Sequence, residues 1–137
     1  MRVATVFFPH KNRDRLMQLA KALSRGIEAQ GHQVDIIDGT RDVNTKLTIY
    51  GYIVVGTDAA NVIGGKIPHR VSEFLSSAGI VGGKKSFAFV PKRLIGGTRT
   101  LRRLMNVMEH EGMFLKLSDA LGSPDEAEEI GKRLSIG

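Results

Sequence analysis

The sequence predicts an α/β fold in which a five-stranded parallel sheet of order 2-1-3-4-5 has helices on both faces, the arrangement called doubly wound. Two observations lead to this prediction. Short apolar segments alternate along the chain with amphipathic ones, and each strand–helix–strand step takes about 30 residues. The apolar segments also show almost no alternation with polar residues, which is typical of strands buried on both faces. From the length of 137 residues we expect one domain over residues 1–137.

Five segments have the composition of strands, because β-branched, aromatic and other apolar residues dominate them. Each is bounded by glycine, proline or a polar loop, and Pro91 is expected to end the fourth. Between the second and third strands, residues 40–49 give a weak signal, typical of a short helix or an irregular crossover. The predicted strands are residues 3–8, 33–38, 50–56, 86–90 and 113–117.

The intervening and final segments place apolar residues three and four positions apart, which predicts helices with one buried face each. Their ends have the residue types that favour helix starts and stops. The expected start signals are Asn12, Pro68, Thr98 and the pair Ser123-Pro124, and the expected stop signals are Gly31, Gly79 and Gly112.

Charge is distributed unevenly along the chain. The formal net charge is +6, and seven basic residues with no acidic one fall between Lys84 and Leu104. From Ser118 onward acidic residues outnumber basic ones. A basic middle indicates an anionic ligand or partner, or simply a solvated helix face.

Composition excludes several classes of function. The chain has no cysteine, which excludes disulfides, thiol catalysis and cysteine-ligated iron–sulfur clusters. Its N-terminal apolar stretch is too short for a signal peptide, and no run approaches the roughly 20 apolar residues that span a bilayer. We therefore expect a cytoplasmic protein without a membrane segment. No arrangement of residues nominates a catalytic group or a metal site.

In an open parallel sheet, ligands bind beyond the carboxyl ends of the strands, where the strand order reverses between strands 1 and 3. Three predicted loops meet there, and all of them carry basic side chains. The first and third lead into helix N-termini, whose free N–H groups favour anions. We therefore expect a small anionic ligand that contains phosphate. The candidate binding residues are His10, Lys11, Asn12, Arg13, Thr57, Asp58, Ala59, Ala60, Asn61, Pro91, Lys92, Arg93, Gly96 and Gly97.

Several stretches in the middle of the chain follow one another in an order that resembles a known family. They are Ile53-Val54-Val55-Gly56-Thr57, Pro68, Val71-Ser72-Glu73-Phe74-Leu75 and Gly83-Lys84-Lys85. They look like the middle of flavodoxin-like proteins. The resemblance implies the cofactor flavin mononucleotide (FMN), with its phosphate held in the first loop by hydroxyls and backbone N–H groups. It further implies electron transfer or flavin-dependent reduction, with a redox partner.

The chain resembles a divergent member of that family, one that lacks the usual phosphate-loop motif. Its first loop contains no Gly, Ser or Thr, and Pro9 has no N–H to donate. It has no Trp, and its only tyrosines, Tyr50 and Tyr52, precede the loops that cover the flavin ring in the family. Its net charge is positive, whereas electron-transfer flavodoxins are typically acidic.

Two other functions stay open. The missing motif favours a non-flavin module of the same fold that binds another anion or a protein partner. The Lys84–Arg103 segment suggests nucleic-acid binding, although no aromatic residue suited to base stacking is interleaved with its loop and helix arginines. Asp58 is expected to form an Asx turn with its own backbone, and it also suits a hydrogen bond from a flavin N–H or a sugar hydroxyl.

Overall fold

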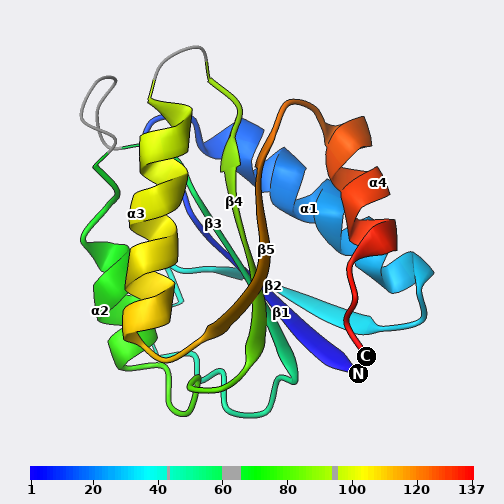
Figure 1. Ribbon diagram of the computed structural model, residues 1–137, viewed down its shortest axis with the longest axis horizontal. Helices are drawn as coiled ribbons and strands as arrows, with labels where there is room; N and C mark the ends of the chain where they lie inside the picture. Colours follow the sequence, from blue (N-terminus) through cyan, green and yellow to red (C-terminus); the bar gives the residue numbers. More distant parts are fainter. Residues whose placement is uncertain (43, 60–65, 94–95) are drawn as a thin grey trace.

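The computed structural model describes residues 1–42, 44–59, 66–93 and 96–137. All strand pairs in its single described sheet are parallel, and the strand order is β2-β1-β3-β4-β5 (Figure 1). This confirms the predicted fold class and strand order. The strands are β1 (Arg2–Phe8), β2 (Gln33–Asp38), β3 (Tyr52–Thr57), β4 (Lys85–Pro91) and β5 (Phe114–Leu121), and the helices are α1 (Arg13–Ala29), α2 (Arg70–Ser76), α3 (Gly97–His110) and α4 (Pro124–Arg133).

The helices form two layers, with α1 and α4 on one face of the sheet and α2 and α3 on the other (Figure 1). Side chains of β1 alternate between them: Val3 and Phe7 pack under α1 and α4, while Val6 and Phe8 pack under α2 and α3. Because both faces are covered, the central strands are apolar throughout, as the sequence predicted. None of the helices in the described ranges is both long and apolar enough to cross a membrane.

Two glycines bring the backbones of α1 and α4 into direct contact. A Cβ on Gly26 would overlap the carbonyl oxygen of Glu128, and a Cβ on Gly131 would lie 3.0 Å from the Cα of Gly26. Beside this crossing, Nε2 of Gln30 donates to the carbonyl oxygens of Gly131 at 2.7 Å and Leu134 at 2.9 Å. The end of α4 is therefore fixed to α1 by backbone contact and by hydrogen bonds.

The helix ends confirm some predicted signals and correct others. Asn12 caps α1 by accepting the N–H of Arg15 at 3.1 Å, and Ser123 caps α4 in the same way. However, α2 begins at Arg70, two residues after Pro68. Thr98 is not the N-cap of α3; that place is taken by Gly96, whose φ of +83° is in the left-handed region that glycine adopts readily.

Strand limits differ from the predictions mainly at β5. This strand continues to Leu121, four residues past the predicted end, because it stays paired with β4 as far as Pro91. Its edge position exposes polar side chains, which ended the predicted apolar segment too early. Pro91 belongs to β4 and pairs with Leu121 instead of ending the strand before it. The described part of residues 40–49 forms turns rather than a helix, and the ammonium of Lys84 donates to carbonyl oxygens at its end, including that of Leu47 at 3.1 Å.

Tyr52 provides a test of core burial at alkaline pH. Burial raises the pKa of its phenol from 10.0 to about 12. A raised pKa contributes stability that is complete below pH 10 and is lost as the pH rises through about 12. We expect the free energy of unfolding to fall more steeply between these values in the wild type than in Tyr52→Phe, measured by urea unfolding at each pH. Parallel pH profiles for the two proteins would contradict this.

Candidate functional site

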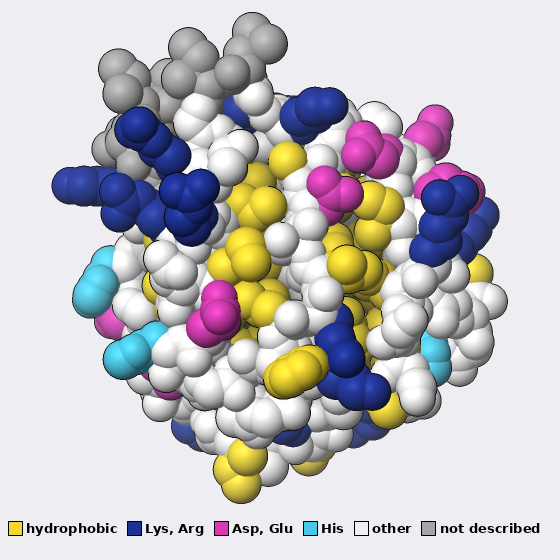
Figure 2. All heavy atoms as spheres, in the orientation of Figure 1, with side chains coloured by type: hydrophobic (Ala, Val, Ile, Leu, Met, Phe, Trp, Pro, Cys, Tyr) yellow, Lys and Arg dark blue, Asp and Glu magenta, His cyan; other side chains and the backbone are white. Residues whose placement is uncertain are grey.

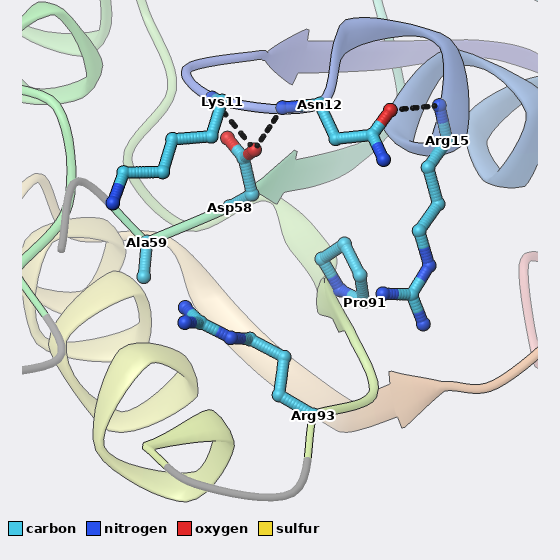
Figure 3. A pocket seen from close by; sticks show the side chains of 7 residues that line it. All are labelled: Lys11, Asn12, Arg15, Asp58, Ala59, Pro91 and Arg93. Atoms are coloured by element: carbon cyan, nitrogen blue, oxygen red, sulfur yellow. Dashed lines mark hydrogen bonds between the residues drawn. The ribbon is translucent and has the colours of Figure 1, made fainter. Parts of the chain in front are cut away.

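Asp58 joins the first and second loops at the carboxyl ends of the strands. Its carboxylate accepts the backbone N–H groups of His10 at 2.6 Å, Lys11 at 3.0 Å and Asn12 at 3.1 Å (Figure 3 shows the last two). The residue is 7% exposed. The carboxylate therefore bonds the N–H groups of another loop; the Asx turn expected for Asp58 would use the N–H of residue 60, which lies outside the described residues.

Strand register explains this contact. In the parallel pair β1–β3, Phe8 is the partner of Thr57, so the residues after both strands emerge side by side. The Thr57 hydroxyl donates to the Phe8 carbonyl at 2.8 Å and is fully buried. Thr57 therefore fastens the two strand ends together and does not face a ligand, whereas Asp58, one residue later, reaches the first loop.

A hollow of about 180 Å³ lies beside Asp58. Figure 3 shows the Arg93 guanidinium directed toward Ala59 and the Arg15 guanidinium beside Pro91. The hollow is lined by Lys11, Asn12, Arg15, Asp58, Ala59, Pro91 and Arg93. Three cationic side chains thus line the hollow with one carboxylate, whose charge is already shared among three N–H donors. The balance favours an anion.

Six of the fourteen predicted site residues line the hollow, and others are directed elsewhere. Arg13 pairs with Asp38 at the end of β2 instead of lining the hollow. Lys92 contributes to the site through its backbone, because its carbonyl oxygen accepts a hydrogen bond from Nη2 of Arg15 at 2.8 Å. Gly96 and Gly97 begin α3, and Ala60 and Asn61 lie outside the described residues.

Arg15 is the lining residue that the candidate set omits. It lies in the first turn of α1, and its N–H is bonded by the Asn12 cap. A basic residue three positions after an N-cap returns to the same end of the helix, because one turn takes 3.6 residues. The three-residue spacing from Asn12 to Arg15 therefore indicates, from sequence alone, that Arg15 lies beside the first loop.

The predicted basic segment Lys84–Arg103 does not form one surface. Lys84 and Lys85 lie where β4 begins, at the amino ends of the strands, and Lys84 is held by backbone carbonyls there. Arg93 lies at the opposite end of the sheet, beside Asp58. The arginines of α3 lie in a third place, on the exposed surface of that helix.

The chain was compared with known proteins. No family model matches it, and no curated protein matches it in sequence. Solved structures do match: oxidised flavodoxin 1 from Bacillus cereus has a TM-score of 0.75 at 16% identity, covering 98% of this chain and 100% of that one. A flavodoxin from the domain Archaea has a TM-score of 0.69 at 18% identity, covering 99% and 94%. The Streptococcus pneumonia TIGR4 flavodoxin has a TM-score of 0.72 at 14% identity, covering 97% of each chain. The chain has the flavodoxin-like fold.

The first loop is a poor fit to the phosphate of FMN as flavodoxin-like proteins hold it. Such a phosphate needs free backbone N–H groups and hydroxyls in this loop, but the N–H groups of residues 10–12 are bonded to Asp58 and the loop has no hydroxyl side chain. A phosphate brought to the same N–H groups would also meet the Asp58 carboxylate, an unfavourable like-charge contact. Neither residues 57–66 nor residues 91–97 contain an aromatic residue to cover a flavin ring.

Proposed function

We propose that this chain is a non-flavin module of the flavodoxin-like fold that binds a small phosphate-containing anion at the carboxyl ends of β1, β3 and β4. The main support is the Asp58 carboxylate, which accepts hydrogen bonds from the first-loop N–H groups that an FMN phosphate would need. The ligand is therefore held by side chains, by Lys11 and Arg93 in particular, in the hollow beside Asp58. At about 180 Å³ the hollow is below the roughly 300–1,000 Å³ of sites for drug-sized ligands, and suits a smaller group.

The test is a comparison of anions by thermal shift and isothermal titration calorimetry. Inorganic phosphate should raise the melting temperature of the wild type in a saturable way, and FMN should raise it no more than phosphate does. The double variant Lys11→Gln/Arg93→Gln should lose at least about tenfold in phosphate affinity, because two charge-assisted contacts are removed.

The matched control is Lys21→Gln/Lys85→Gln, which removes the same two charges at exposed positions in α1 and at the start of β4. It should bind phosphate like the wild type. Equal loss in both double variants would show that net charge alone attracts phosphate, and the proposed site would be wrong.

FMN binding, with electron transfer or flavin-dependent reduction and a redox partner, is the second candidate. Its support is the likeness to solved flavodoxins over nearly the whole chain. A visible absorption spectrum separates the two functions. We expect a colourless protein that stays colourless after incubation with excess FMN and desalting; retained yellow colour with a flavin spectrum would favour FMN and contradict the first proposal.

A further inference from the structure

A second basic surface lies outside the hollow at Asp58. Figure 2 shows Lys and Arg side chains gathered over α3, in the upper left of the view. Two hollows of about 320 and 290 Å³ adjoin there and share the side chains of Arg103 and Asn106. We call this surface the α3 basic face; its residues are Lys66, Arg99, Arg102, Arg103 and Asn106.

The cations of the α3 basic face lack carboxylate partners. Within residues 1–42, 44–59, 66–93 and 96–137, no Asp or Glu lies within 4.0 Å of their charged groups. The remaining positions contain no Asp or Glu. The three arginines are exposed and lie within five residues of one helix, so they repel one another. Their charge is available to an external anion.

One of the two hollows is also partly apolar. Ile67 and Val107 line it together with Lys66 and Arg103, and both apolar side chains are half-buried. A ligand that carried only charge would leave this apolar area exposed to water. The surface therefore matches a ligand that combines anionic groups with an aliphatic side chain.

The spacing of the arginines along α3 matches an extended peptide. Arg99 and Arg103 are one turn apart, about 6 Å along the helix axis. In an extended chain, side chains on the same side recur every second residue, about 6.7 Å apart. Two carboxylates on alternate residues therefore reach Arg99 and Arg103, and an aliphatic side chain two residues further along, on the same side of the peptide, reaches the hollow at Ile67 and Val107.

We propose that the α3 basic face binds an extended acidic segment of another protein, with carboxylates on alternate residues and an aliphatic side chain seated between Ile67 and Val107. A nucleic acid is less well suited, because none of the described residues that line the two hollows is aromatic and able to stack on a base. A second copy of this chain is also less well suited. Its acidic helix α4 already uses Glu128 and Glu129 in ion pairs with its own Arg25 and Lys132.

The experiment is fluorescence anisotropy with a fluorescein-labelled peptide, Gly-Glu-Ser-Glu-Ser-Leu-Gly, whose two Glu and one Leu share one side of an extended chain, titrated with the full chain at low ionic strength. We expect saturable binding that weakens as salt is added, and no binding of the peptide in which Gln replaces each Glu. Arg99→Gln/Arg103→Gln should bind the acidic peptide about tenfold more weakly, since two ion pairs are lost. Both sites are exposed, so circular dichroism and melting temperature should match the wild type.

The matched control is again Lys21→Gln/Lys85→Gln, which gives the same net charge and should bind the peptide like the wild type. Three results would overturn the proposal: no binding of the acidic peptide, equal weakening in both double variants, or tighter binding of a labelled oligothymidylate than of the peptide. Self-association in analytical ultracentrifugation that Arg99→Gln/Arg103→Gln abolishes would instead assign the face to a second copy.

Discussion

Gly131→Ala should destabilise the protein by about 3 kcal/mol or more, although alanine is the better helix former by about 1 kcal/mol. The added Cβ would overlap the carbonyl oxygen of Leu23, and backbone on both sides leaves it no flexible side chain to displace. Helices α1 and α4 must therefore separate. The measurement is the free energy of unfolding from urea denaturation, followed by circular dichroism.

The control for this prediction is Gly82→Ala. A Cβ there would meet its nearest atom, the carbonyl oxygen of Glu111, at an ordinary 3.8 Å. Gly82→Ala should change the free energy of unfolding by no more than about 1 kcal/mol, because the main effect of alanine is to restrict the unfolded chain. If Gly131→Ala were as stable as Gly82→Ala, the close crossing of α1 and α4 would be wrong.

Asp58→Ala should lower the free energy of unfolding by about 2–3 kcal/mol. Hydrogen bonds to a charged group are worth about 1.5–3 kcal/mol each, but water replaces part of this at the exposed residues His10 to Asn12. Asp58→Asn is the informative comparison, because its single amide oxygen retains some of the three bonds. We expect its loss to be about half that of Asp58→Ala, again by urea unfolding.

Asp58→Ala also tests whether the N–H groups of the first loop form an anion site when the carboxylate is removed. Asp58→Ala leaves the N–H groups of His10, Lys11 and Asn12 free beside the N-terminus of α1. Phosphate should then stabilise Asp58→Ala more than it stabilises the wild type. At a phosphate concentration ten times the Kd of the variant, the free energy of unfolding of the variant should rise by about 1.4 kcal/mol. Sodium chloride at equal ionic strength is the control. An equal phosphate effect on both proteins would contradict the prediction.

The central sheet was predictable because its strands are covered on both faces. Burial there demands continuous apolar segments, and β1, β3 and β4 supply them. β5 was underestimated because it lies at the edge, where side chains such as Lys116 stay exposed and polar residues are tolerated. The start of α3 was misplaced because Thr98 is a good N-cap by composition, but Gly96 takes the left-handed conformation that the turn requires.

The candidate site was predictable in its location but not in its contacts. Parallel topology is enough to place the loops after β1, β3 and β4 at one edge, which accounts for Lys11, Asp58 and Arg93 meeting there. The bonds of Asp58 depend on how two loops far apart in sequence fit together. Local preference indicates only a turn within its own loop, and no local pattern indicates the contacts with residues 10–12.

The crossing of α1 and α4 also has a consequence for how the chain folds. Gln30 and Gly131, which meet at that crossing, are 101 residues apart in sequence. During synthesis α1 can pack on the first strands early, but the surface around Gly26 has no partner until residues 124–133 have left the ribosome. Contacts between such distant segments form slowly, because a long loop must close first. Docking of α4 is therefore expected to be a late step, and the uncovered surface of α1 is the part most exposed to misfolding until then.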